Sequence, residues 1–164
     1  MKRRECIKLA KLASRGENTK LIEALRGIQR NRSRDLAGLG WHVNGHERRG
    51  TWQQSAKRVA NWIGDGMTGT PPFTIFARGN SKLPFYAFSA LPLVTCPGMG
   101  ACAKFCYSLR AWRYPAAFFR QLQNLLLIKQ APTTIADAFA KLPIAATLRL
   151  YVDGDIDSAE TLAF

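Results

Sequence analysis

Three of the four cysteines in the 164-residue chain lie close together, in the segment TCPGMGACAKFCY that runs from residue 95 to residue 107. Five residues separate Cys96 from Cys102, and three separate Cys102 from Cys106. Thiolates are soft ligands, and several of them in one short segment suit a zinc ion or an iron–sulfur cluster. Cysteines also fill hydrophobic cores, so inert core thiols and a disulfide are alternative interpretations. The proline and glycines of the segment argue against a packed strand, and the pattern therefore predicts a metal site.

The number of thiols separates two kinds of metal site. A structural zinc site needs a fourth ligand, and the other cysteine and the histidines of the chain are Cys6, His42 and His46, all distant in sequence. The Asn44-Gly45 turn between the two histidines argues against a helical ligand pair there. A four-iron cluster held by three thiolates instead keeps one iron open for a small molecule.

The helix expected to follow the first cysteine has a direct bearing on this site. Cys102 and Cys106 are four residues apart, so both sulfurs lie on one face if a helix has begun at Cys102. The first turn of such a helix also directs unpaired backbone N–H groups at the loop, which favours thiolate over thiol. We expect this helix to continue over residues 103–113.

A second group of polar residues follows an alternating apolar stretch near the end of the chain. The stretch 147–152 reads as a strand and runs into Asp153, Gly154 and Asp155. The alternating aspartates are similar to a calcium loop, but Phe164 stands where the loop needs a glutamate. This departure argues against calcium, and a helix cap is the simpler alternative.

Two resemblances rest on these segments. A cysteine loop after an apolar strand, with Phe105 just before the third cysteine and a later strand that ends in Gly-Asp, resembles the opening of radical-SAM enzymes. The radical-SAM pattern has three and two residues between its cysteines, whereas this chain has five and three. More closely, CPGMGACAKFCYSLRAWRYPAAFFRQLQN followed by RLYVDGD resembles the gene-product-88 family of phage and plasmid proteins. This resemblance covers residues 85–160, the second half of the chain.

The resemblance implies a cofactor and the residues that would hold it. Cys96, Cys102 and Cys106 would bind a 4Fe-4S cluster, with zinc as the alternative metal. Asp153, Gly154 and Asp155 would bind S-adenosylmethionine, and Asp155 would receive the amino group of its methionine part. An intact site of this kind would cleave S-adenosylmethionine reductively. The chain stops before the further strand–helix units of a barrel, so the resemblance implies a truncated relative and leaves an enzymatic activity open.

The elements that position these residues indicate an α/β or α+β fold. Segments 73–77 and 85–95 read as strands joined by the Gly79-Asn80-Ser81 turn, and the second strand leads into Cys96. Pro115 begins a helix whose buried face contains Phe118, Leu122, Leu125 and Leu126, and a short helix follows over residues 132–142. The order strand, helices, strand is βαβ-like and favours a parallel pairing of 85–95 with 147–152, as at the start of a truncated barrel.

The first part of the chain reads as a basic helical segment. Helices are expected over residues 4–14 and 18–30, the second capped by Asn18. Thr51 and Gln54 form a capping box for a third helix that ends at Gly64 and carries an apolar stripe of Trp52, Ala56, Val59, Trp62 and Ile63. We place a boundary after this helix, between a basic segment 1–64 and an α/β metal- or cluster-binding domain 65–164.

Charge is concentrated in the first half of the chain. The net charge is +13, and residues 1–82 hold 17 basic and 6 acidic side chains, a net +11. Such an excess predicts an anionic partner, most often nucleic acid contacted through its phosphates, or a face that only keeps the protein in solution. No stretch is long and apolar enough for a signal peptide or a membrane span, so we expect a cytoplasmic protein with reduced thiols and no membrane insertion.

Two functional hypotheses follow. The first is a plasmid or phage protein that binds a metal or an iron–sulfur cluster through the three cysteines and is radical-SAM-like. The second is a non-enzymatic, basic accessory protein that acts on DNA or on the transfer or replication machinery of another plasmid. Inhibition of conjugation, known as fertility inhibition, is an example of the second function, and in that case the thiols are structural.

Overall fold

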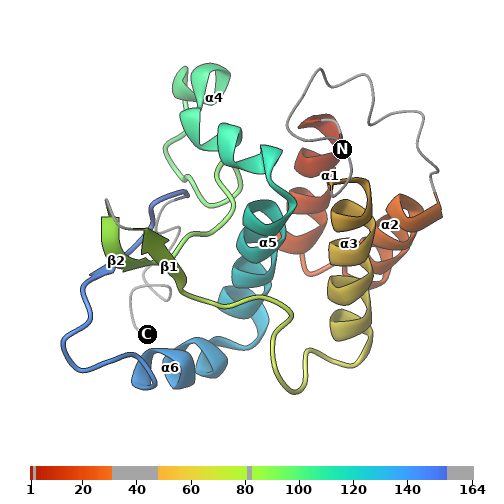
Figure 1. Ribbon diagram of the computed structural model, residues 1–164. Helices are drawn as coiled ribbons and strands as arrows, with labels where there is room; N and C mark the ends of the chain where they lie inside the picture. The colour runs from red at the N-terminus through yellow and green to blue at the C-terminus, as the bar shows by residue number, and fades with distance from the viewer. Residues whose placement is uncertain (2, 31–47, 81–82, 155–164) are drawn as a thin grey trace.

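The structure is a computed structural model that describes residues 1, 3–30, 48–80 and 83–154. Three helices from the first half of the chain gather on one side of the molecule, and a small sheet lies on the other side (Figure 1). Between them runs α5 (Pro115–Gln130), which packs against helices from both halves of the chain (Figure 1). The mixed α/β class expected from the sequence is confirmed.

The first three helices form because apolar residues recur on one side of each. They are α1 (Arg3–Ser14), α2 (Asn18–Arg30) and α3 (Arg48–Gly64). The stripe predicted for the third helix is confirmed, since all five of its residues are buried: Trp52, Ala56, Val59, Trp62 and Ile63. The predicted capping box of Thr51 and Gln54 is wrong, because α3 begins at Arg48 and Thr51 lies inside the helix.

Asn18 also has a different role from the predicted cap. Its side-chain amide exchanges two hydrogen bonds with the amide of Gln130, at 2.8 and 3.1 Å. The partner lies 112 residues away at the end of α5, so local sequence spacing gives no sign of it. Asn18 therefore joins the start of α2 to the last turn of the central helix.

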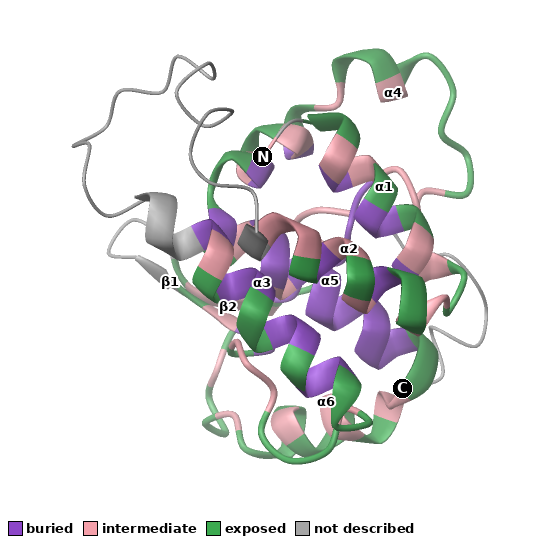
Figure 2. Cartoon of the chain, turned by 90° about the vertical axis from the view of Figure 1, so that its right-hand side faces the viewer, coloured by how far each residue is buried: buried purple, intermediate pink, exposed green. Residues whose placement is uncertain are grey.

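The central helix α5 is buried on all its sides rather than on one face. Pro115 occupies its first turn, as predicted, and supplies the fixed φ that a helix start needs. Every residue from Gln121 to Ile128 is buried, including three polar ones: Gln121, Gln123 and Asn124. Figure 2 shows α5 largely in the colour of buried residues, with the neighbouring helices packed around it. The predicted apolar face is confirmed but is only part of the buried surface.

The sheet has three short strands in the order β1-β2-β3. The strands β1 (Ala77–Asn80) and β2 (Leu83–Ala87) pair antiparallel, and β3 (Leu148–Arg149) pairs with β2 in parallel, as expected from the βαβ-like order. The first strand is shifted from the predicted 73–77, since Gly79 and Asn80 lie in β1 and not in the turn, and β3 is shorter than the predicted 147–152. The strand predicted over 85–95 is shorter than expected, since β2 ends at Ala87, and the chain then turns at residues 92–95, where Leu93 has a φ of +73°. The described strands form an open sheet and not a closed barrel.

The segment after the first cysteine of the loop contains two short helices instead of one long one. The four-residue helix α4 (Cys102–Phe105) is followed by a 3-10 helix, η2 (Tyr107–Arg113). The last helix, α6 (Pro132–Ala140), lies where the sequence predicts a short helix opened by Pro132. The predicted continuous helix over 103–113 is therefore wrong, and the break falls at Cys106.

Residues on both sides of the predicted domain boundary contribute to one hydrophobic core. Leu9 of α1 and Val59 of α3 belong to the same buried cluster as Phe118 and Leu122 of α5. Both α1 and α3 pack against α5. The division at residue 64 stays a prediction about folding units. Among the described residues, none of the helices has the length and apolar composition needed to cross a bilayer.

Candidate functional site

The three predicted ligands lie outside the core, and the fourth cysteine lies inside it. Cys102 is exposed, while Cys96 and Cys106 are half-buried. Cys6 is buried in α1, where loss of hydration raises the pKa of its thiol to about 12. All four cysteines are in the described part of the chain, and none forms a disulfide. Cys6 is thus a core thiol, and the three others are placed where a ligand could reach them.

The helical turn expected between two of these thiols is present, but the helix does not continue beyond it. Cys102 is the first residue of α4, but the helix ends at Phe105, and Cys106 has a ψ of +110°. The φ of Cys106 is −53°, as in a helix, and its ψ redirects only the chain that follows, so Cys102 and Cys106 still lie one helical turn apart on one face of α4. A helix of four residues nevertheless aligns too few peptide groups to favour a thiolate in the way that the sequence suggested.

The three thiols of the loop are suitable ligands for a soft metal, but they are not arranged as a metal site. Three thiols within eleven residues have the chemistry that zinc and iron–sulfur clusters require. Within residues 1, 3–30, 48–80 and 83–154, however, no three Cys, His, Asp or Glu side chains are grouped as metal ligands. His42 and His46 lie outside the described residues. The metal assignment of Cys96, Cys102 and Cys106 therefore stays a prediction.

The second group of predicted site residues lies at the base of the cysteine loop. The backbone carbonyl of Asp153 accepts a hydrogen bond from the N–H of Ala90 at 3.0 Å, so the end of the last strand follows the chain that leads into the loop. The Asp153 carboxylate accepts a hydrogen bond from Gln121 Nε2 at 2.9 Å and another from the Ser108 side chain. Trp112 Nε1 in turn donates to Gln121 Oε1 at 2.9 Å. One carboxylate thus connects the segment after β3 with η2 and α5.

Burial of this carboxylate changes its titration. Partial loss of hydration raises the pKa of Asp153 above its ordinary value, although the hydrogen bonds from Ser108 and Gln121 and the charge of Arg149 act in the opposite direction. The hydrogen bonds of the Asp153 carboxylate with Ser108 and Gln121 indicate a structural role at the base of the loop. The cofactor role that the resemblance implies for Asp153 and Gly154 stays a prediction, and Asp155 lies outside the described residues.

Gly154 holds the other end of the loop by close packing. Its φ is +84°, and a Cβ at this position would lie 2.6 Å from Thr95 Oγ1 and 3.0 Å from the Ala90 carbonyl oxygen. Thr95 is buried, and its hydroxyl donates to the Leu91 carbonyl at 2.9 Å. Only glycine fits this conformation and this contact without strain. The cysteine loop, residues 96–107, is therefore held on both sides, by Gly154 at Thr95 and by Asp153 at Ser108.

Sequence reasoning missed the residues that hold the loop. Ser108, Trp112 and Gln121 carry no motif, and their partners come from other elements. Gln121 gives the one available signal, because a glutamine inside the apolar run of α5 must find a hydrogen-bond partner.

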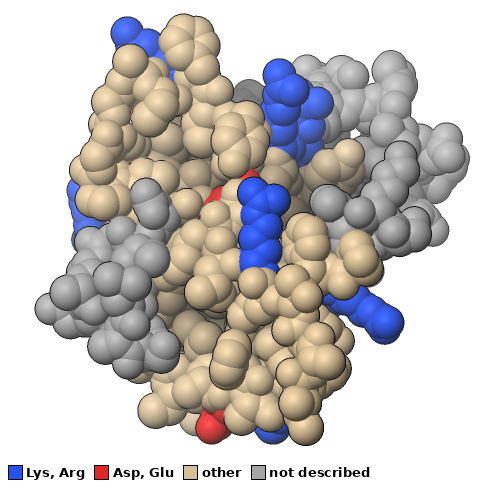
Figure 3. All heavy atoms as spheres, turned by 90° about the vertical axis from the view of Figure 1, so that its left-hand side faces the viewer, with Lys and Arg blue, Asp and Glu red and all other residues tan. Residues whose placement is uncertain are grey.

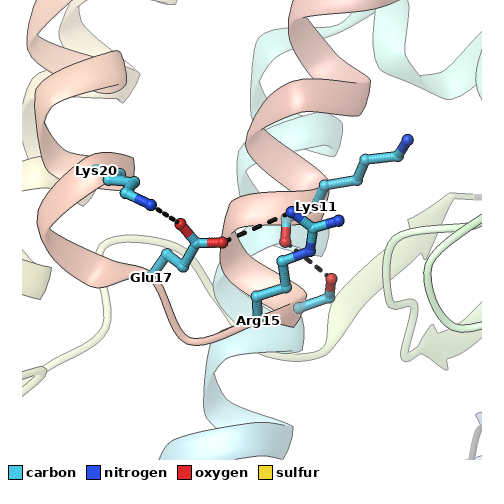
Figure 4. Close-up of polar contacts among 5 residues, drawn as sticks. Lys11, Arg15, Glu17 and Lys20 are labelled. Atoms are coloured by element: carbon cyan, nitrogen blue, oxygen red, sulfur yellow. Dashed lines mark hydrogen bonds and ion pairs between the residues drawn. The ribbon is translucent and has the colours of Figure 1, made fainter.

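A basic stripe runs along the exposed side of α1. It consists of Arg4, Lys8, Lys11 and Arg15, all exposed, and at 3.6 residues per turn these positions fall within an arc of about 60°. Near its end, Glu17 bridges Arg15 at 3.7 Å and Lys20 at 2.6 Å, while the Lys11 side chain extends away from this pair (Figure 4). One carboxylate shared by two cations leaves the stripe strongly positive.

On the side of the molecule that carries the sheet, Lys and Arg side chains are separated by uncharged surface (Figure 3). Figure 3 shows this side, and its visible surface is mostly uncharged, with acidic side chains only near the middle and at the lower edge. Large apolar side chains are exposed in the loop itself: Met99, Phe105 and Tyr107. The segment around α4 extends from the body of the molecule (Figures 1 and 2).

Comparison with known proteins gives one match. The family model described as gene product 88 matches residues 43–163, which include the cysteine loop, α5 and the Asp153-Gly154 strand end. The match begins well upstream of the resemblance recognised in the sequence. No curated protein and no solved structure matches the chain.

Proposed function

This chain belongs to the gene product 88 family, and from that premise we propose that it is a cytoplasmic protein of a plasmid or phage that binds a metal through Cys96, Cys102 and Cys106. The observation that supports the proposal most is the anchoring of the cysteine loop at both ends. Gly154 packs on Thr95 just before the first thiol, and Asp153 binds Ser108 just after the last. A loop held at both ends presents its thiols over a limited range of positions.

For the three thiols to bind one metal, the backbone between Thr95 and Ser108 must change its conformation. Residues 97–102 are exposed and contribute nothing to the hydrophobic core. Gly98 and Gly100 allow many backbone conformations, and nothing lies within 4 Å of a Cβ built on either. Because thiolate–metal bonds release far more free energy than such a loop needs to rearrange, metal binding would draw the three sulfurs together.

An iron–sulfur cluster is the form of the site that three protein ligands favour, and zinc is the alternative. Three thiolates leave one iron of a four-iron cluster open, where a small molecule such as S-adenosylmethionine would bind. Zinc would instead need a fourth ligand. Cys6 cannot supply it without leaving the core.

Anaerobic purification with iron and sulfide reconstitution tests this proposal. We expect a brown protein with thiolate-to-iron charge-transfer absorbance and about four irons per chain, and loss of both in Cys102→Ala. Cys6→Ala is the matched control, since it removes a thiol from the core and leaves the colour unchanged. A colourless protein with one zinc per chain selects the alternative metal, and a protein that holds neither metal refutes the site.

The basic stripe supports a second candidate function, the binding of nucleic acid. Arg4, Lys8, Lys11 and Arg15 extend over about 16 Å of helix, which is enough to follow several phosphates. The opposite side of α1 is buried in the core through Cys6, Leu9, Ala10 and Ala13. That side is not available for insertion into a membrane, so a polyanion in solution is the better partner. This candidate agrees with an accessory role in plasmid transfer or replication.

Salt dependence of binding tests the second candidate. Replacing the four stripe residues by glutamine should make the slope of log K against log salt concentration less steep by about 3.6, because each of the four lost phosphate contacts removes roughly 0.9. The matched control removes the same charge from exposed sites on other elements, at Arg26, Lys57, Lys129 and Lys141. Equal slopes in the two variants would show that total charge, and not the stripe, determines binding.

A further inference from the structure

Two aromatic rings in the cysteine loop have no place in the core. Phe105 is 83% exposed at the end of α4, and Tyr107 is 69% exposed at the start of η2. Most of the other aromatic residues among the described ones pack against each other, as in the cluster of Trp52, Phe118 and Phe119. Aromatic side chains exposed to this extent on one short segment indicate a surface that contacts a partner.

The same segment carries positive charge without any negative charge. Lys104 and Arg110 are exposed beside the two rings. The sequence contains no Asp or Glu from residue 66 to residue 136, so no neighbour in the chain neutralises these cations. In Figure 3 the lobe formed by the segment around α4 shows no acidic surface. The segment therefore exposes aromatic rings and positive charges side by side.

The loop also contacts the helix that carries the basic stripe. Arg3 Nη2 at the start of α1 donates a hydrogen bond to the carbonyl oxygen of Ala103 at 3.3 Å, although the two residues are 100 positions apart. The stripe begins at Arg4, the next residue. A polyanion that follows the stripe towards the start of α1 would thus reach the exposed rings of the loop.

We propose that the cysteine loop is a stacking platform for single-stranded nucleic acid. Phe105 and Tyr107 stack on unpaired bases, while Lys104, Arg110 and the α1 stripe contact the phosphates. In a duplex the base faces are covered by neighbouring bases, so only a single strand gives the rings a partner. The proposal rests on the nucleic-acid binding proposed for α1 and goes beyond it, because stacking selects single strands, which phosphate attraction alone does not.

The test compares a fluorescently labelled oligothymidine with a labelled duplex of the same length, by fluorescence anisotropy at low salt with the full chain. We expect the wild type to prefer the single strand by about tenfold or more. Phe105→Leu and Tyr107→Leu keep an apolar side chain but remove the ring, and each should weaken single-strand binding by about 5- to 150-fold. Neither should change duplex binding.

Phe139→Leu is the matched control, since this ring is 58% exposed on α6, away from the loop, and its loss should leave both affinities unchanged. Thermal unfolding of each variant verifies that it is folded. Equal wild-type affinity for single strand and duplex, with no effect of the loop variants, would overturn the platform while leaving the α1 proposal intact. Absence of binding to either oligonucleotide would overturn both proposals and assign the exposed rings to a protein partner.

Discussion

Asp153 illustrates how one side chain can organise a loop that is distant in sequence. Its carboxylate is shared between Ser108 of η2 and Gln121 of α5, and Gln121 is itself fixed by Trp112. A half-buried carboxylate with two donors is held in place, because leaving either donor unpaired inside the protein costs free energy. The residue after it, Gly154, is equally constrained by Thr95.

The raised pKa of Asp153 predicts a specific pH dependence of stability. Burial raises the pKa of the folded state above the ordinary value of 3.8, so between these values the folded protein binds more protons than the unfolded chain. The carboxyl group therefore stabilises the fold at acidic pH, and this contribution is lost as the pH rises through the folded pKa. Asp153→Asn keeps the hydrogen-bonding shape and cannot titrate.

Urea unfolding of both proteins from about pH 4 to pH 7 measures this effect. The free energy of unfolding of the wild type should fall relative to that of Asp153→Asn as the pH rises. A difference that stays constant over this range would show that Asp153 titrates alike in the folded and unfolded chains.

Replacement of Gly154 tests the contact that holds the start of the loop. Gly154→Ala combines a strained positive φ with a Cβ 2.6 Å from Thr95 Oγ1, and we expect a loss of about 3 kcal/mol or more in the free energy of unfolding. Gly16→Ala is the control, because Gly16 has a similar φ of +68° but nothing within 4 Å of a Cβ. The free energy of unfolding of Gly16→Ala should fall by about 1 kcal/mol. If urea unfolding shows the same loss of free energy for both variants, Thr95 moves away from the new Cβ at no cost in stability.

At the scale of elements, α5 joins the helices to the sheet through polar side chains. Gln123 exchanges two hydrogen bonds with the backbone of Phe73, at 2.8 and 2.9 Å, in the way that a neighbouring strand would. Asn124 Nδ2 donates to the carbonyl oxygens of Ile75 and Ser89, at 3.1 and 3.0 Å. The segments before β1 and after β2 are thus fixed to the central helix by side chains that a purely apolar helix would lack.

Asn124→Leu should therefore destabilise the protein despite its similar size. The carbonyl groups of Ile75 and Ser89 lose a buried donor, and the expected loss is about 2 to 4 kcal/mol in the free energy of unfolding. Gln130→Leu is the matched control on the same helix, since its hydrogen bonds with Asn18 are exposed and water can replace them. Its loss should stay below about 1 kcal/mol in the same urea titration. Equal losses at the two sites would argue against a structural role for the buried amide.

At the scale of the whole molecule, the helices of residues 1–64 cover α5. Both α1 and α3 pack on it, and Leu9 and Val59 lie in the same buried cluster as Leu122. Without these helices, much of the apolar surface of α5 would face water. Two independent folding units would each need an apolar surface of their own.

A fragment of residues 65–164 should consequently fail to unfold cooperatively. We expect it to bind a hydrophobic dye and to lack the near-ultraviolet circular dichroism of the full chain, because α5 loses the partners that bury it. Addition of a peptide of residues 1–64 should restore both signals. A sharp thermal transition in the isolated fragment would instead establish residue 64 as a true domain boundary.

The sequence by itself determined the elements whose pattern is local. The stripe of α3 and the Pro115 start of α5 follow from residues a few positions apart. The antiparallel pairing of β1 with β2 and the parallel pairing of β2 with β3 follow from the order of strands and helices. The clustering of three thiols in one loop is also a property of the sequence, since covalent connection keeps them near one another.

Only the tertiary structure decided which long-range partners these elements have. Asn18 pairs with Gln130 instead of capping its helix, and Gln121 binds Asp153. Sequence spacing carries information about neighbours along a helix or strand, whereas these contacts join positions from 32 to 112 residues apart. The difference is physical: a buried polar group must find a partner, but which partner it finds depends on how the whole chain packs.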